Sequence, residues 1–157
     1  MSATSIPAFH VSGPSKAKGK GDVFIDSRKD AVSSGIFHIE IDVHFDPAGA
    51  DNYPGGSLSI KTDMSDGAKG IFIAATFELI NSYGKHNPTI YLTGQCKSDA
   101  ASTAPLHGCR YWVMVANNTK DNKGTPDIVG FCIHDRNGNR IAYGTGPLKG
   151  DIDVAPN

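Results

Sequence analysis

The stretch FHIEIDVHFD, residues 37–46, alternates between apolar and polar side chains along its whole length. One parity holds Phe37, Ile39, Ile41, Val43 and Phe45, and the other holds only histidines and carboxylates. Successive side chains of a β-strand point to opposite faces, so the pattern predicts a strand with one apolar and one polar face. The apolar face predicts a buried sheet surface, whereas the polar face could be either a site or a solvated surface.

The same period of two recurs along most of the chain. The segments that show it are bounded by Gly, Asn, Asp and Pro clusters and cover 22–26, 35–45, 56–62, 70–80, 88–96, 109–116, 127–135, 139–146 and 150–155. No segment combines a helical period with capping residues. We therefore predict an all-β fold of about nine strands without substantial helix, as an antiparallel β-sandwich, with a small β-barrel as the alternative.

The 157 residues fit a single domain. Residues 1–20 end in SGPSKAKGKG and predict a flexible N-terminal leader, with order expected only around IPAFHV; residues 21–157 form the predicted all-β domain. The formal charge of −1, from 15 basic and 16 acidic residues, argues against nucleic acid as a partner. The apolar runs are too short to span a bilayer, and the first residues lack the pattern of a secretory signal.

Two connections predict strand registers. Asn137-Gly138 favours a two-residue hairpin turn, which places Phe131 opposite Gly144, Ile133 opposite Ala142 and Cys132 opposite Tyr143. Both faces of this hairpin are apolar, so we expect it to be packed on two sides. Matching the apolar faces of 35–45 and 56–62 predicts Val43 opposite Ile60 and Asp42 opposite Lys61.

The polar face of 37–46 supplies the candidate metal ligands His38, Glu40, Asp42 and His44. Residues six apart on a strand are separated by about 20 Å, so the two histidines cannot share one ion. Any ion would need further ligands from a neighbouring strand. A solvated polar face is the preferred interpretation, and a ligand-contacting face inside a barrel is a third.

Five residues are candidates for ligand binding, namely Tyr91, Arg110, Trp112, His134 and Tyr143. Arg110, Tyr111 and Trp112 could form an aromatic-cationic patch, or Trp112 and Met114 could instead fill the core. In the barrel alternative, Tyr91, His134, Tyr143 and Glu78 would point inward and orient a ligand. No nucleophile elbow, phosphate loop or other convergent reactive group is present, so we predict no catalytic residue and no cofactor, and favour a non-enzymatic protein.

The three cysteines have different surroundings. Cys96 and Cys109 flank a polar loop between two predicted strands, where a hairpin base could hold them close enough for a disulfide in an oxidising compartment. The reduced pair is the alternative. Cys132 lies within an apolar strand and is expected to be a free thiol.

The C-terminal half carries a series of strands, glycines and turns in IYLTG (90–94), GCRYWVMVA (108–116), DNKGTPDIVGF (121–131) and GTGPLKGDI (144–152). Over residues 88–155 this series resembles the post-COAP-like β-modules of bacterial secreted and cell-surface proteins. The resemblance implies a β-sandwich accessory module without known chemistry, in an extracellular location. The chain departs from the pattern in its cysteines and its longer 97–108 loop.

We therefore hypothesise a non-enzymatic β-sandwich module with a structural or binding role. Its partner would be a protein or small molecule that the sequence does not identify, and self-association into a homo-oligomer is left open. The alternative is a small β-barrel that binds or converts an apolar small molecule in its lumen.

Overall fold

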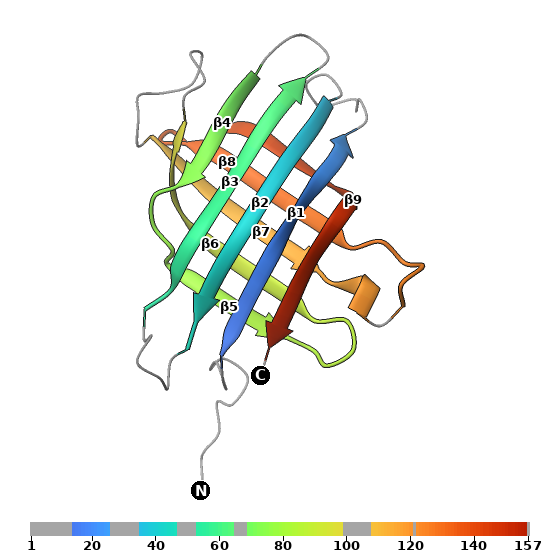
Figure 1. Cartoon of the computed structure of the whole chain (residues 1–157). Helices are drawn as coiled ribbons and strands as arrows, with labels where there is room; N and C mark the ends of the chain where they lie inside the picture. The colour runs from blue at the N-terminus through green and yellow to red at the C-terminus, as the bar shows by residue number, and fades with distance from the viewer. Residues whose placement is uncertain are drawn as a thin grey trace, which may run out of the picture.

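The computed structural model describes residues 14–25, 35–46, 53–64, 69–98, 108–120 and 122–156 (Figure 1). These ranges contain nine β-strands and one short 3₁₀ turn, η2 (Asn118–Lys120). The strands are β1 (Ser15–Ile25), β2 (Gly35–Phe45), β3 (Gly55–Met64), β4 (Lys69–Ala74), β5 (Leu79–Tyr83), β6 (Thr89–Ser98), β7 (Cys109–Ala116), β8 (Ile128–Asp135) and β9 (Arg140–Pro156). The predicted all-β class is confirmed.

The strands close into an eight-stranded antiparallel barrel. β4 and β5 both pair with β6, one after the other, and together they take the place of one strand of the wall. The hydrogen-bonded order is β4-β3-β2-β1-β9-β8-β7-β6-β5, and an additional pairing joins β4 to β6. That pairing sets Phe72 opposite Ser98 and Ala74 opposite Cys96, which closes the wall. The predicted sandwich is therefore wrong, and the barrel alternative is confirmed.

The barrel is flattened, so that two groups of strands cross one another. In Figure 1, β4, β3, β2, β1 and the C-terminal half of β9 lie in front, and β5 to β8 run across behind them. The 17 residues of β9 belong to both groups, since its first half pairs with β8 and its second half with β1. The sequence pattern predicts this one strand as two, 139–146 and 150–155, and it predicts β4 and β5 as the single strand 70–80.

The interior is filled by the inward side chains of every strand. Along β2, for example, Phe37, Ile39, Ile41 and Val43 are all at most 3% exposed. Phe37 meets Phe131 of β8 edge-on, with ring centroids 4.6 Å apart, so the two crossing groups touch at the centre. Eight-stranded barrels are just wide enough for side chains to fill. The apolar parity of 37–46 is thus the core-facing one, as predicted.

Small residues allow the backbones of the paired strands β1 and β9 to lie close together. Gly21 lies opposite Gly150, whose φ is +147°. A Cβ atom added to Gly150 would lie 2.4 Å from the backbone oxygen of Lys20, closer than any real contact. Residues 15–20, which the sequence analysis assigned to the flexible leader, form the first half of β1. They were missed because Ala and Gly, rather than large apolar residues, occupy their inward positions.

The two predicted registers have different outcomes. In the β8–β9 hairpin, Phe131, Cys132 and Ile133 lie opposite Gly144, Tyr143 and Ala142, which confirms the prediction. The turn itself is longer than predicted: the backbone nitrogen of Gly138 donates to Asp135, and a bulge between Ile133 and His134 restores the register.

For β2 and β3 the predicted register is wrong by four residues. Ile39, not Val43, lies opposite Ile60, and His38, not Asp42, lies opposite Lys61. Alternation determines which side chains share a face, but a shift by an even number of residues preserves that match. Alternation alone therefore left several registers equally good.

Candidate functional site

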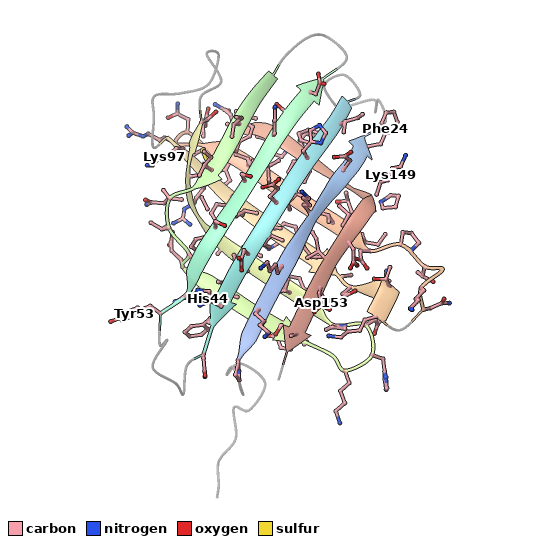
Figure 2. The ribbon with its side chains drawn as sticks, viewed as in Figure 1. Phe24, His44, Tyr53, Lys97, Lys149 and Asp153 are labelled. Atoms are coloured by element: carbon pink, nitrogen blue, oxygen red, sulfur yellow. A yellow bond between two sulfur atoms is a disulfide. The ribbon has the colours of Figure 1, made fainter. Side chains whose placement is uncertain are left out.

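The polar face of β2 lies on the outside of the barrel wall. Glu40, Asp42 and His44 are exposed and His38 is half-buried, and Figure 2 shows His44 near the lower end of β2. Within the described ranges, no three His, Cys, Asp or Glu side chains come close enough to hold a metal ion. The exposure of the four residues agrees with the solvated alternative, and a metal site on this face stays a prediction.

Lysines of β1 balance the negative charge of this face. Lys18 lies between Asp42 of β2 and Asp153 of β9, and Lys20 lies between Glu40 and Asp151 in the same way. Opposite charges directly across a sheet contribute about 0.2–1 kcal/mol per pair when exposed. Further along, His38 pairs with Asp22, and both side chains are nearly half exposed. Rows of opposite charges thus run across β2, β1 and β9 on this surface, and they favour the observed register of the three strands.

The five candidate ligand-binding residues come together on the outer surface of β6 to β9. Trp112 lies opposite Cys132, which lies opposite Tyr143, and Arg110 lies opposite His134. Trp112 is 43% exposed, so it does not fill the core. The inward positions of β7 are instead taken by Tyr111, Val113 and Val115.

Two expectations are therefore wrong. Tyr91, His134 and Tyr143 point away from the lumen, and Glu78 is exposed. The β8–β9 hairpin is packed on one side only, because the barrel wall is a single layer there. Its second apolar face, which includes Cys132 and Tyr143, is part of the molecular surface.

Aromatic rings follow one another across this surface. The ring centroids of Tyr83 and Tyr91 are 6.2 Å apart, and those of Tyr91 and Trp112 are 6.4 Å apart. The guanidinium carbon of Arg140 lies 4.2 Å from the ring centre of Tyr143, a cation–π contact. We call the surface formed by Tyr83, Tyr91, Trp112 and Tyr143 the outer aromatic face.

The β5 part of this face was not predicted from the sequence. Tyr83 is 49% exposed and Leu79, opposite Thr93, is 46% exposed. Tyr83 lies between the predicted strands 70–80 and 88–96, in the segment NSYGKHN, whose Gly and Asn residues are typical of a turn. No local pattern indicates that the chain resumes pairing with β6 after Ala74.

An ion pair borders the outer aromatic face. The Nη2 atom of Arg110 lies 2.8 and 2.7 Å from the two carboxylate oxygens of Glu78, so one nitrogen bonds both oxygens. Tyr111, which is buried next to Arg110, donates its hydroxyl to the backbone oxygen of Thr76 at 2.7 Å. Burial, with a smaller effect from the charge of Glu78, raises the pKa of Tyr111 well above its ordinary value. These contacts fix the irregular segment between β4 and β5 to β7.

A cleft of about 420 Å³ lies beside this ion pair. Its lining includes Gln95, Cys109, Arg110, His134, Asp135 and Arg136. Cys109 is directly opposite Cys96, with Cα atoms 5.0 Å apart, and the two form the predicted disulfide. Hydrogen bonds from Asn139 and Asn137 lower the pKa of Asp135. The carboxylate of Asp135 is used to hold the β8–β9 turn.

A second polar cluster surrounds η2 and is structural. Asp127 is fully buried, and its carboxylate accepts bonds from the backbone nitrogen of Thr119 at 3.0 Å and of Ile152 at 3.2 Å. The hydroxyl of Thr119 lies within 3.1 Å of Asp127 and Asp151. These bonds tie the β7–β8 connection to β9.

No family model matches the chain, and no significant match was found among curated proteins or solved structures. The resemblance to post-COAP-like modules therefore stays a prediction. Across the six described ranges, no helix has the length and apolar character needed to cross a membrane.

Proposed function

We propose that this chain is a non-enzymatic binding module that contacts its ligand through the outer aromatic face. The observation that carries the proposal is the placement of Tyr83, Tyr91 and Trp112 in one continuous row of partly exposed rings. Exposed apolar surface of this kind is typical of interaction sites. Aromatic rings also offer large contact areas at a low entropy cost, which favours them in recognition surfaces.

The packing of the lumen favours a binding site on the outer surface over one in the interior. A cavity large enough for a ligand would leave its lining side chains accessible to a water-sized sphere. Leu92, Val113, Ile133 and Ile152 are instead 0% exposed, and they come from four different strands. A ligand in the lumen, the alternative function, would have to displace such side chains at a cost of several kcal/mol.

The charged side chains beside the outer aromatic face favour a ligand that carries both ring-like and polar groups. Arg140 already lies over Tyr143, and the Arg110–Glu78 pair borders the row at the level of β7. Both offer hydrogen-bonding groups next to apolar rings. The Glu78–Arg110 pair and the carboxylate of Asp135 are engaged in structural bonds, which supports binding without chemistry.

Trp112 is the only tryptophan of the chain, so its fluorescence reports directly on this face. We expect the apolar dye anilinonaphthalene sulfonate to bind and to change the Trp112 emission. Replacing Tyr83 and Tyr91 together by Ser should weaken dye binding about ten-fold or more, since aromatic ring contacts contribute about 0.5–1.5 kcal/mol each, roughly 1–3 kcal/mol for the two rings. The matched control is Tyr53→Ser, because Tyr53 is 78% exposed and is not part of the face.

Unchanged dye binding in the double variant would contradict the proposal and favour the lumen. The same proteins can then be screened against glycan and peptide arrays, with the double variant as the reference. A ligand captured by the wild type and by Tyr53→Ser, but not by the double variant, is the expected outcome.

We also infer an oxidising, extracellular location. Disulfides persist mainly in such compartments, and the Cys96–Cys109 pair supports the inference. Protein isolated from its source without reductant should then contain one reactive thiol, that of Cys132. Three reactive thiols would contradict this inference.

A further inference from the structure

The outer surface of β5 to β9 contains a continuous region without charge. Three rows of outward side chains cross these strands; they begin at Leu79, Asn81 and Tyr83 of β5 and end at Tyr143, Thr145 and Pro147 of β9. No residue of the three rows carries a charge. The rows contain all four rings of the outer aromatic face, and we call the whole region the uncharged face.

The opposite side of the barrel has the reverse composition. The outward side chains in the first part of β1 are Lys16, Lys18, Lys20 and Asp22, and all four are charged. Surfaces that stay in contact with water are usually rich in such residues of both signs. The uncharged face lacks them over five neighbouring strands, and contiguous apolar patches of this kind mark interaction sites.

The chemistry of the uncharged face makes it complementary to its own copy. Besides its rings and aliphatic groups, it presents the hydroxyls of Thr89, Tyr91 and Thr145. A hydroxyl can both donate and accept a hydrogen bond, so two identical sets of hydroxyls can bond to one another. Two copies of a surface with a net charge would instead repel each other.

The size of the uncharged face matches what a dimer needs. Five strands about 4.8 Å apart and three rows about 6.7 Å apart cover roughly 24 by 20 Å, or about 480 Å². Two such faces bury roughly 1,000 Å² in projection, and the relief of the side chains adds to this area. A specific interface needs about 1,000 Å² in total, so the area fits a weak and reversible dimer.

We propose that the uncharged face pairs with the same face of a second copy of this chain, as a symmetric homodimer. The inference rests on the proposed function in taking the outer aromatic face as a contact surface, and it names the partner. In a symmetric dimer the centre of the shared face lies on the two-fold axis, where residues meet their own copies. Met114 lies in the middle row of β7, the middle strand of the five, and is therefore closest to this axis.

Sedimentation velocity at protein concentrations of about 1–200 µM tests the dimer. The wild type should shift from monomer to dimer as the concentration rises, and the emission of Trp112 should move to shorter wavelength as its ring leaves water. Met114→Glu sets two carboxylates against each other at the axis and should weaken the dimer about a hundred-fold or more. The matched control is Tyr53→Glu, at an exposed position outside the uncharged face, which should dimerise like the wild type.

Two results would overturn the inference: a wild type that stays monomeric throughout, or a dimer that survives Met114→Glu. The proposed function is judged separately, by the dye measurement at the low end of the concentration range. A monomer that loses dye binding when Tyr83 and Tyr91 are replaced by Ser would support the proposed function without the dimer. Unchanged dye binding together with a dimer that Met114→Glu abolishes would contradict the ligand and leave the dimer.

Disulfide trapping keeps the test decisive if Met114→Glu disturbs folding. In a Cys132→Ser background, Met114→Cys should form a covalent dimer under mild oxidation, and Tyr53→Cys should not. A covalent dimer at both positions, or at neither, would overturn the inference.

Discussion

Replacing Asp127 by Ala should be among the most destabilising single substitutions in this barrel. The side chain is 0% exposed, and it joins the β7–β8 connection to β9. Its carboxylate accepts from the backbone nitrogen of Thr119 in η2 and from that of Ile152 in β9. These donors belong to the backbone, so they remain after the substitution and lose their acceptor.

The cost follows from the number of donors left without a partner. A buried donor without an acceptor costs about 1–3 kcal/mol, so the two nitrogens cost roughly 2–6 kcal/mol together. The hydroxyl of Thr119 adds little, because Asn117 at 3.0 Å and Asp151 at 3.1 Å can accept from it instead. We expect a loss of about 4 kcal/mol, or about 8–16 °C in Tm for a chain of this length.

Urea unfolding followed by the fluorescence of Trp112 measures this loss directly. The matched control is Asp153→Ala, since the Asp153 side chain is 66% exposed; among the described residues it bonds Asn117 and Lys120. The control should lose less than about 1 kcal/mol. If Asp127→Ala costs no more than Asp153→Ala, the reasoning from unsatisfied backbone donors is refuted. Asp127→Asn should fall between the two, because its amide keeps one acceptor oxygen.

Three further predictions concern the disulfide, a buried phenol and the face of β2. Replacing Cys96 by Ser should lower the free energy of unfolding by about 3 kcal/mol, as expected for a closed loop of this size, while Cys132→Ser should leave it nearly unchanged; denaturant titrations without reductant check both. The raised pKa of Tyr111 means that its contribution to stability is complete below pH 10.0 and is lost as the pH rises above that value, because the unfolded chain then loses the proton first. Tyr111→Phe should therefore flatten the fall in Tm above pH 10.0, and Tyr53→Phe, at an exposed position, should not; Tm values that fall equally steeply in all three proteins would contradict this assignment. Substituting the four outward residues of β2 together by Ser or Thr should leave the fold, any bound metal and the binding of dye intact, as circular dichroism, elemental analysis and fluorescence can show; these residues are His38, Glu40, Asp42 and His44.

The sequence by itself determined which side chains share a face. The alternation in 37–46 correctly placed Phe37, Ile39 and Ile41 in the core and the histidines outside it. The β8–β9 register was also predictable, because the two strands are neighbours in the chain and a short turn leaves few alternatives. Local patterns of this kind act over a few residues, so they are readable without knowledge of the fold.

The tertiary structure alone decided how the strands meet across long separations. The closure of β4 on β6, the extension of β1 back to Ser15 and the division of 70–80 into two strands all depend on partners elsewhere in the chain. The exposure of Trp112 was also decided by the tertiary structure. The alternation showed which residues of β7 share a face with Trp112, but it did not show which of the two faces is buried. An alternating strand with apolar groups on both faces can turn either one inward. Only the closed barrel, by filling its lumen with Tyr111, Val113 and Val115, left the aromatic rings on the surface.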